Sequence, residues 1–355
     1  MDVALLAPVY ATAPAGLEDV AAREATDSGH RCLVERPGRL RFEAAHPRGL
    51  LSALRCVHDL RLSIVSGPPL LSISPSEVGE RVSRLIESSP LFDAARAFDT
   101  GGQPLRYRLT FEGLRLRRDI VRRIVDGVRQ AVDDNGLENS PSHYAVRLAL
   151  EETAEASHLW LVPAFEPDQR FAYRVRDVGA SIDPVVAAGL ARLARTHSTG
   201  VAIDPCCGSG TLLVERARLD PAVRLRGVDV SPTAIAAAKA NVAAAGLADR
   251  IEIHHGDAAE AASWGPCAEA LSNLPFGIRS ARHDRDLPRL YRRIVAHLAH
   301  TLQRNGRAVL YTANAQMMTE TLAAHRRQLT LVERRDVEAG GLVVGVWIVA
   351  PVASR

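Results

Sequence analysis

The chain has 355 residues, 47% of them hydrophobic and 24% charged, and a formal net charge of +3 at pH 7; these values describe a globular chain of two or three domains and argue against a disordered protein. The weakly basic balance permits a nucleic-acid partner without requiring one, so the distribution of arginines matters more than their sum. Five cysteines without a Cys-x-x-Cys pair argue against a disulfide framework, and the lack of a signal-peptide pattern or a membrane-length apolar run predicts a cytoplasmic protein with no membrane partner.

The first predicted domain covers residues 1–65. Its apolar pattern and turn residues predict a strand–helix–strand–strand–helix–strand order. The strands are expected at 9–12, 31–35, 39–43 and 59–65, and the helices at 17–28 and 47–54. This order is typical of a ferredoxin-like domain.

The second predicted domain covers residues 66–168 and begins with a segment rich in Pro and Ser at 66–76. We expect helices at 77–86 and 119–132, and strands at 105–110, 144–150 and 158–165. In the helix at 119–132, the apolar residues Ile120, Ile124, Val128 and Val132 recur every four positions, so they predict one buried face.

Residues 169–186 are expected to form a linker to a third domain at 187–355. This domain alternates strands, at 201–203, 224–228, 251–254, 269–271 and 307–312, with helical stretches, a pattern typical of a parallel sheet with right-handed crossovers. The last segment, 329–352, reads as a hairpin turning at Gly340-Gly341. A mostly parallel sheet that ends in an antiparallel strand resembles the sheet of S-adenosylmethionine-dependent methyltransferases.

A glycine-containing turn at residues 204–211, Asp-Pro-Cys-Cys-Gly-Ser-Gly-Thr, joins a predicted strand to a predicted helix. Gly208 and Gly210 lack a Cβ atom and so allow a nucleotide-like ligand to approach the backbone closely. No lysine follows these glycines, which excludes a P-loop, and the absence of a third glycine weakens the case for a dinucleotide site.

Acidic residues end three successive strands of this predicted domain, namely Asp204, Asp229 and Asp257. Each of them taken singly is equally well explained as a strand-end or capping residue, but open parallel sheets bind ligands at this edge. The likeness to methyltransferases implies S-adenosylmethionine as the ligand, with Asp204 at its ammonium group, Asp229 at its ribose hydroxyls and Asp257 at its adenine. The residues that we expect to contact it are Asp204, Cys206, Gly208, Gly210, Thr211, Asp229, Asp257, Ala258 and Asn273.

The segment Asn273-Leu274-Pro275-Phe276-Gly277 follows the fourth predicted strand and is our candidate catalytic loop. The Asn273 side chain and a backbone carbonyl, at Leu274 or Pro275, would accept the two hydrogens of a conjugated amine and aim its nitrogen at a methyl donor. Pro275 fixes the backbone and Phe276 offers a face for base stacking, worth about 1–3 kcal/mol. The competing interpretation is a proline turn with a core phenylalanine.

Arginines gather in two stretches, 101–130 and 279–307, and we expect RNA contacts from Arg106, Arg108, Arg118, Arg122, Arg279 and Arg282. The competing interpretation is a set of solvated helix faces in an arginine-biased proteome. The histidines, His297 among them, lack partners at metal-ligand spacing, so we expect surface or loop histidines and no metal site.

Several sequence segments, spread over most of the chain, resemble the THUMP-containing tRNA guanine-N2 methyltransferases. They are APVYATAPAGLEDVAAREA and GRLRFEA near the start, and RFAYRVRDVGASIDPVVAAGLARLA, DPCCGSGTLLVERA, GVDVSPTAIAAAKANVAAAGL and SNLPFG further on. The resemblance implies an N-terminal ferredoxin-like plus THUMP α+β module and a C-terminal Rossmann-like class I methyltransferase domain.

The same resemblance implies the substrate. The THUMP module would hold the 3′ end and acceptor stem of tRNA, and the monomeric enzyme would methylate a guanosine, with position 6 expected. A position-10 or ribosomal RNA guanine-N2 methyltransferase is the alternative. A protein-glutamine N-methyltransferase and an RNA-binding protein without turnover are less favoured.

Overall fold

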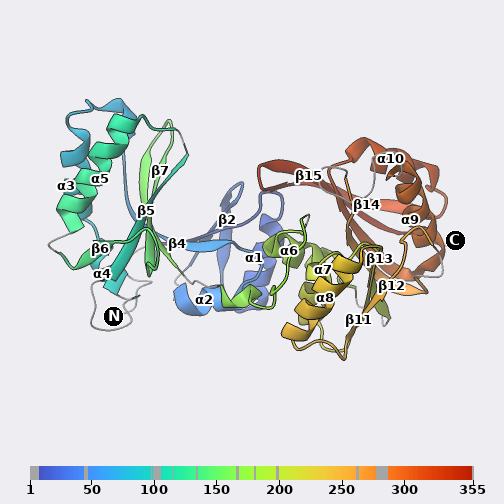
Figure 1. Cartoon of the computed structure of the whole chain (residues 1–355). Coiled ribbons are helices and arrows are strands. Elements are labelled where there is room, and N and C mark those ends of the chain that lie inside the picture. Colours follow the sequence, from blue (N-terminus) through green and yellow to red (C-terminus); the bar gives the residue numbers. More distant parts are fainter. Residues whose placement is uncertain are drawn as a thin grey trace. The chain divides into compact units, whose positions relative to one another are not determined.

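The computed structural model describes residues 8–43, 47–96, 98, 105–113, 115–132, 135–164, 168–179, 181–196, 200–260, 264–276 and 287–353. The chain forms two compact units (Figure 1). The first comprises Ala22–Pro167 with the segment up to Ala13, and the second comprises Asp168–Arg355 with Pro14–Ala21. None of the helices in the described ranges is long and apolar enough to cross a membrane.

The first unit is built on an eight-stranded sheet in the order β2-β3-β1-β4-β8-β7-β5-β6. Its first elements confirm the predicted strand–helix–strand–strand–helix–strand order, and every neighbouring pair among β1 to β4 is antiparallel. The bounds are β1 Val9–Thr12, α1 Glu18–Asp27, β2 Cys32–Arg36, β3 Arg39–Phe42, α2 Pro47–Ala53 and β4 Asp59–Gly67.

The sheet continues without a break past the predicted boundary at residue 65, because β4 pairs with β8, with Leu62 opposite Leu161. The remaining bounds are α3 Val78–Glu87, α4 Leu91–Arg96, β5 Leu105–Gly113, α5 Arg118–Val132, β6 Leu137–Asn139, β7 Val146–Glu152 and β8 Ser157–Pro163. The short elements α4 and β6 are not predicted by the sequence pattern, since neither is long enough to show a period. The assignment of 1–65 and 66–168 to ferredoxin-like and THUMP domains stays a prediction.

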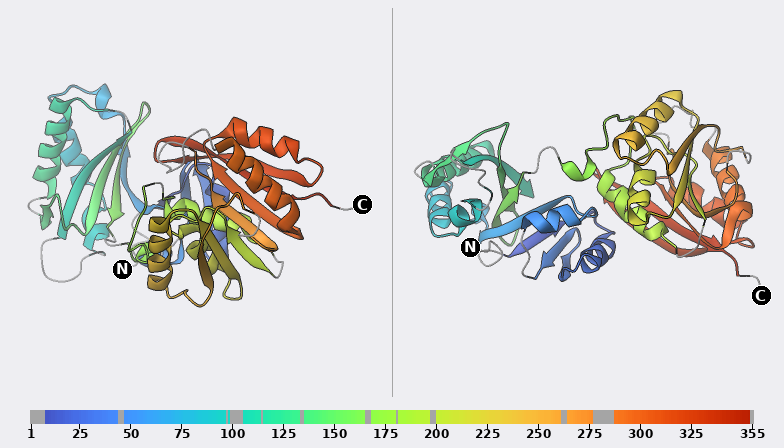
Figure 2. Two further views of the ribbon diagram at one scale, coloured as in Figure 1. Left: turned by 45° about the vertical axis from the view of Figure 1, so that its right-hand side comes forward. Right: turned by 90° about the horizontal axis from the view of Figure 1, so that it is seen from below.

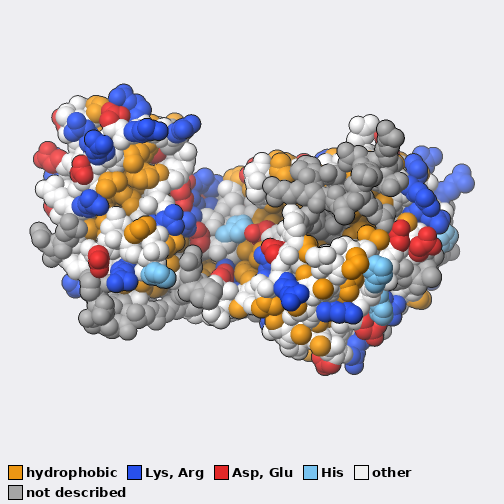
Figure 3. All heavy atoms as spheres, viewed as in Figure 1, with side chains coloured by type: hydrophobic (Ala, Val, Ile, Leu, Met, Phe, Trp, Pro, Cys, Tyr) orange, Lys and Arg blue, Asp and Glu red, His pale blue; other side chains and the backbone are white. Residues whose placement is uncertain are grey.

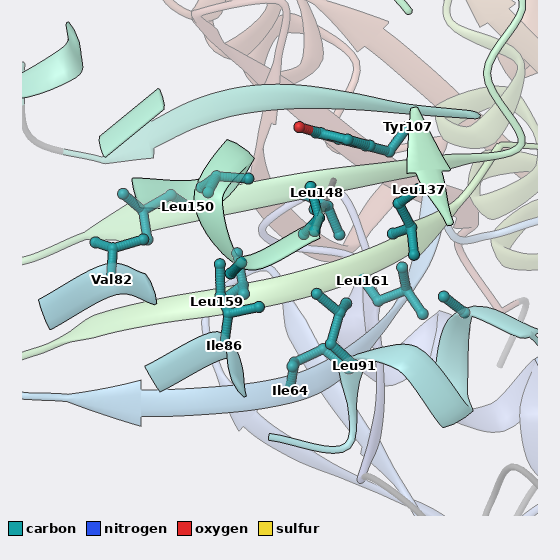
Figure 4. Close-up of a cluster of buried hydrophobic side chains, with 14 of the residues drawn as sticks. Ile64, Val82, Ile86, Leu91, Tyr107, Leu137, Leu148, Leu150, Leu159 and Leu161 are labelled. Carbon is teal, nitrogen blue, oxygen red and sulfur yellow. The ribbon is translucent and has the colours of Figure 1, made fainter. Parts of the chain in front are cut away.

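One face of this sheet packs against α3, α4 and α5. The predicted buried face of α5 is confirmed, as its four periodic apolar residues are at most 3% exposed. Figure 4 shows Val82 and Ile86 of α3 beside Leu150 and Leu159 of β7 and β8. Helices α3 and α5 approach closely at Gly127, where an added Cβ atom would lie 2.2 Å from the Gly79 carbonyl oxygen.

The opposite face of the sheet carries an ionic network. The Glu151 carboxylate accepts hydrogen bonds from Arg39 at 3.0 Å and from the Trp160 indole at 2.8 Å. Arg61 bridges Asp59, at 3.0 Å, and Glu112, at 2.8 Å. These pairs join strands β3 and β4 to strands β5, β7 and β8, so they link both predicted halves of the unit.

The second unit is built on a seven-stranded sheet in the order β11-β10-β9-β12-β13-β15-β14. Strands β11, β10, β9, β12 and β13 are parallel to one another, and β15 is antiparallel to β13 and β14, as predicted. Helices α6 to α8 cover one face and α9 and α10 the other (Figures 1 and 2). The strand bounds are β9 Val201–Asp204, β10 Arg224–Asp229, β11 Ile251–His255, β12 Cys267–Asn273, β13 Leu302–Thr312, β14 Leu329–Ala339 and β15 Leu342–Pro351, and the helix bounds are α6 Pro184–Ala194, α7 Thr211–Leu219, α8 Pro232–Ala244, α9 Leu287–Thr301 and α10 Ala315–Ala324.

Candidate active site

A cavity of about 780 Å³ opens at the carboxyl edge of the second sheet. It lies where the strand order reverses between β9 and β12, the place at which open parallel sheets bind their ligands. Predicted residues that line it are Asp204, Cys206, Gly208, Thr211, Asp229, Ala258, Asn273, Pro275 and Phe276. The structure therefore brings most of the predicted cofactor residues and the whole predicted catalytic triplet to one cavity.

The glycine turn after β9 is shaped by two left-handed residues, Gly208 with φ of +53° and Gly210 with φ of +80°. Residues that carry a side chain rarely adopt such backbone angles. A Cβ atom added to Gly208 would meet only Val178, at 3.9 Å, so the turn stays open there. Gly210 is instead the residue before α7, where an added Cβ atom would lie 3.4 Å from Ala238, so it shapes the turn without lining the cavity.

Asp204 is a buried carboxylate at the end of β9, only 1% exposed. It accepts hydrogen bonds from the Ser272 hydroxyl at 2.8 Å and from the Cys206 backbone amide at 3.1 Å. Burial raises the pKa of Asp204 to about 7, and the charge of Asp229 acts in the same direction. Within the described ranges no arginine, lysine or histidine forms an ion pair with it, so this carboxylate fits the ammonium group of an amino-acid ligand.

Asp229 at the end of β10 is held by two backbone amides, those of Gly208 at 2.9 Å and Ser231 at 2.8 Å. Its carboxylate thus ties the second strand end to the glycine turn and lines the cavity. Asp257 differs, because its carboxylate accepts the Ala259 amide at 2.8 Å and the residue is not among those lining the cavity. Its neighbour Ala258 does line the cavity.

The segment predicted to be a linker contributes one wall of the cavity, through residues 177–179 and 181–183. Asn241 of α8, which is fully buried, fastens this segment to the glycine turn. Its Oδ1 accepts the Arg176 amide at 2.9 Å, and its Nδ2 donates to the carbonyls of Arg176 at 2.7 Å and Ser209 at 3.0 Å. The sequence analysis did not identify Asn241 as a residue of the site, and its only local signal is that it is a single amide side chain within an alanine-rich helix.

The candidate catalytic loop leaves β12 at Asn273 and is anchored by hydrogen bonds through one backbone amide and one backbone carbonyl. The Leu274 amide donates to the Tyr311 carbonyl of β13 at 2.9 Å, and the Tyr291 hydroxyl of α9 donates to the Pro275 carbonyl at 3.0 Å. Leu274 is the fully buried residue of the loop, whereas Phe276 is half-buried and lines the cavity. The interpretation of Phe276 as a core residue is therefore wrong. Gly277 lies outside the described residues.

The predicted RNA-contacting arginines of the first unit lie on two different surfaces. Leu105 and Tyr107 of β5 pack into the core under α5, so the alternating Arg106 and Arg108 lie on the opposite face of the sheet. Arg118 and Arg122 are exposed on α5 (Figure 3 shows arginine and lysine side chains in blue). Arg279 and Arg282 lie outside the described residues.

One histidine expectation is corrected by the structure. His297 is buried in α9, where its Nε2 lies 3.0 Å from the Ala259 carbonyl and its ring packs against Trp264. The apolar period of α9, which places Leu290, Ile294 and Leu298 on the same side, explains why this polar residue is inside. In the part of the chain that the structure describes, no group of three or more metal-ligating side chains is found.

Comparison with known proteins gives one family match and several relatives. Residues 172–344 match the family described as UPF0020 (RMKL-like, methyltransferase domain). The chain is 26% identical over 201 residues to the tRNA (guanine(6)-N2)-methyltransferase of Archaeoglobus fulgidus, and this alignment covers 50% of each chain. It is 35% identical over 99 residues to the U6 snRNA (guanine-N(2))-methyltransferase THUMPD2 of Bos taurus, and this alignment covers 28% of this chain and 20% of that protein. The alignments thus span half or less of the curated relatives.

Among solved structures, the crystal structure of TrmN from Thermus thermophilus superposes with a TM-score of 0.77. The superposition covers 97% of this chain and 99% of that chain at 23% sequence identity. Similarity at this level of identity shows a shared fold over both units of the chain.

Proposed function

From the methyltransferase domain that residues 172–344 carry, we propose that this chain transfers a methyl group from S-adenosylmethionine to the exocyclic N2 of a guanosine in tRNA. One observation carries the proposal. The glycine turn after β9 and the Asn273–Phe276 loop after β12 line a single cavity, and the Ser272 hydroxyl joins the two strand ends by donating to Asp204 at 2.8 Å.

The cofactor part of the cavity suits an adenosyl amino acid without a phosphate. Asp204 offers a buried negative charge to the ammonium group, and Asp229, fixed by two amides, offers acceptors to ribose hydroxyls. The open backbone at Gly208 leaves room for close approach. S-adenosylmethionine supplies an electrophilic methyl group when bound, and Cys206, Thr211 and Ala258 complete the wall around it.

The acceptor part suits a planar amine. The Asn273 side-chain oxygen accepts one amine hydrogen, and a backbone carbonyl accepts the other. The Pro275 carbonyl already accepts the Tyr291 hydroxyl, so the neighbouring Leu274 carbonyl is the better candidate for the second acceptor. Phe276 lines the cavity with its ring available for stacking on a base that is turned out of its helix. The amine gives up one proton to solvent for each methyl group that it gains.

The choice of guanosine N2 in tRNA rests on the Asn-Leu-Pro-Phe form of the loop and on the archaeal relative, whose printed name specifies guanosine 6. Position 6 is accordingly our proposed site. The relative that acts on U6 snRNA favours a second candidate, guanine N2 in another RNA. The first unit, with Arg118 and Arg122 exposed on α5, is proposed as the module that holds tRNA by its acceptor stem and 3′ end, within a cytoplasmic monomer.

The test is methyl transfer to RNA with the complete chain. Purified protein, radiolabelled S-adenosylmethionine and unmodified tRNA transcripts should yield N2-methylguanosine after nucleoside digestion and mass spectrometry. A matched transcript with inosine in place of the guanosine at position 6 lacks only the 2-amino group, so it should accept no label there. Label that persists in the inosine transcript would assign the methyl group to another nucleotide, and label in protein alone would contradict an RNA acceptor.

A further inference from the structure

The candidate catalytic loop is held by a hydrogen-bonded relay that starts outside it. The Asn314 backbone amide donates to the Thr312 hydroxyl at 3.1 Å. Thr312, the last residue of β13, is hydrogen-bonded through its hydroxyl to the Tyr291 hydroxyl of α9. Tyr291 in turn donates to the Pro275 carbonyl at 3.0 Å. Because the Tyr291 hydroxyl has a single hydrogen and gives it to the Pro275 carbonyl, the Thr312 hydroxyl is the donor in its bond to Tyr291.

Both side chains of the relay are shielded from solvent. Tyr291 and Thr312 are 0% exposed, and Tyr291 belongs to the apolar cluster that α9 forms with β12, β13 and β15. The buried Tyr291 hydroxyl has fixed partners in Thr312, the Asn314 side chain and the Pro275 carbonyl, so it has one orientation, since losing a bond would leave a desolvated polar group. Burial also raises the pKa of Tyr291 to about 12, so the hydroxyl stays a proton donor over the working range of an enzyme.

The relay restrains the loop backbone, because it ends at the Pro275 carbonyl. Pro275 cannot donate a backbone hydrogen bond, so its carbonyl is the residue's sole backbone anchor. Leu274 is anchored on its amide side by the Tyr311 carbonyl at 2.9 Å. Two bonds, from two different elements, therefore fix the peptide units before and after the one that carries the Leu274 carbonyl, and Asn273 and Phe276 lie on either side of it.

We propose that Tyr291 is a positioning residue for methyl transfer, which acts by pinning the Pro275 carbonyl and thereby aiming the acceptors of the Asn273–Phe276 loop. This inference rests on the proposed function of that loop. Tyr291 itself does not touch the substrate, because it lies behind the loop in the core. A displacement of reacting groups by about 1 Å costs up to a hundredfold in rate, so the loss of the pin affects turnover more than binding.

The first test compares Tyr291→Phe with wild-type protein in steady-state methyl transfer and in calorimetric titration with S-adenosylhomocysteine. The expected result is a fall in kcat of about 10- to 100-fold, with the KM for RNA and the Kd for S-adenosylhomocysteine changed by less than about twofold. The matched control is Tyr173→Phe, which also removes a buried tyrosine hydroxyl, one that donates to Glu215 at 2.6 Å, at a site away from the loop. An unchanged kcat in Tyr291→Phe, or an equal fall in both variants, overturns the proposal.

The second test examines the relay itself. Thr312→Val removes the hydroxyl that orients Tyr291, whereas Thr312→Ser keeps it, so only the valine variant should lose turnover. The double variant with Tyr291→Phe should be no slower than Tyr291→Phe alone, because both changes act through one bond to Pro275. Additive losses would contradict a shared path.

A third measurement needs no substrate and separates this inference from the proposed function. Hydrogen–deuterium exchange of the peptide that spans the loop should speed up in Tyr291→Phe and stay at the wild-type rate in Tyr173→Phe. If wild-type protein methylates no RNA, the proposed function fails, and exchange alone decides the pinning. Unchanged exchange of the loop in Tyr291→Phe overturns the proposal whatever the activity of the wild type.

Discussion

Asp59 and Glu151 of the first unit and Asp204 of the second are carboxylates that their surroundings shift in opposite ways. In the first unit, burial opposes the ionisation of Asp59 and Glu151, but Arg61 and Arg39 outweigh it, and the pKa of each carboxyl is lowered. In the second unit, Asp204 is more deeply buried and faces a cavity, and its pKa is raised to about 7. The comparison teaches that a buried acid paired with arginine holds a fold together, whereas one that faces a cavity without a cation is kept for a ligand.

The largest expected effect lies at the loop of the second unit. Asn273→Ala should lower kcat for methyl transfer by at least about 100-fold, because an acceptor for the amine hydrogens is lost from the transition state. The Kd for S-adenosylhomocysteine, measured by calorimetry, should change by less than about threefold. A loss of cofactor affinity as large as the loss of rate would show that Asn273 mainly holds the cofactor.

Asn241→Ala provides the matched asparagine variant for this measurement. It removes the clamp between α8 and the segment around Arg176, so it should weaken S-adenosylhomocysteine binding by about tenfold, the equivalent of about 1.4 kcal/mol. Turnover at saturating cofactor should remain close to that of wild type. Equal effects of the two asparagine variants would abolish the distinction between the loop and the clamp.

Conformational stability tests the comparison directly. Asp59→Asn should lower the free energy of unfolding of the first unit at pH 8 by about 2 kcal/mol, because Arg61 and Arg147 each lose one of their two acidic partners. Asp204→Asn should raise that of the second unit by about 2 kcal/mol, because it removes a carboxylate that burial disfavours in its charged form. Differential scanning calorimetry at pH 8 measures both. Destabilisation by both variants would refute the contrast.

The two carboxyls also differ in the sign of their pH dependence. The folded-state pKa of Asp204 is above its unfolded value, so its contribution to stability is full below about pH 4 and is lost as pH rises to about 7. The pKa of Asp59 is lowered, so its contribution is full above the unfolded pKa and is lost as pH falls below it. In melting curves, the stability difference between Asp204→Asn and wild type should shrink as pH falls from about 7 to about 4. The difference between Asp59→Asn and wild type should shrink only below about pH 4.

Cofactor affinity should follow the ionisation of Asp204. A ligand ammonium binds the charged carboxylate, so the affinity for S-adenosylhomocysteine should rise by about tenfold between pH 6 and pH 8, as the carboxyl titrates near pH 7. Titration calorimetry over this range measures the slope. Asp204→Asn should bind more weakly at pH 8 and show a flat profile, and a flat profile in wild type would mean that Asp204 does not meet the ligand's charge.

The smallest effect is expected on the surface of the first unit, where the structure separates two pairs of arginines. Arg106 lies 3.9 Å from Glu138 and Arg108 lies over the Tyr144 ring, whereas in the described ranges no ion pair is found for Arg118 or Arg122. Replacing the α5 pair by alanine should weaken tRNA binding by about fivefold and reduce the slope of log K against log salt by about 2. The Arg106 and Arg108 double variant is the control, and a larger loss there would move the RNA to the sheet face.

The sequence by itself determined the order of the elements and the place of the site along the chain. Periodicity identifies α5 and the strands of both sheets other than β6, because burial follows a local repeat. The glycine turn and the Asn273–Phe276 loop stand out because their residue types are tied to backbone geometry and chemistry. The strand-end position of Asp204 and Asp229 follows from the same patterns, since Asp204 comes directly after the apolar run 201–203 and Asp229 directly after the predicted strand 224–228.

Only the tertiary structure decided what each of these residues touches. The joining of β4 to β8, the use of residues 177–179 and 181–183 as a cavity wall, and the contact of Tyr291 with Pro275 all connect positions whose separation in the chain carries no local signal. The burial of His297 and the separation of Arg106 and Arg108 from Arg118 and Arg122 depend in the same way on which face an element presents to its neighbours. Pairing between distant strands and helices sets these contacts, because a side chain's partner is chosen by packing in space and by its desolvation there.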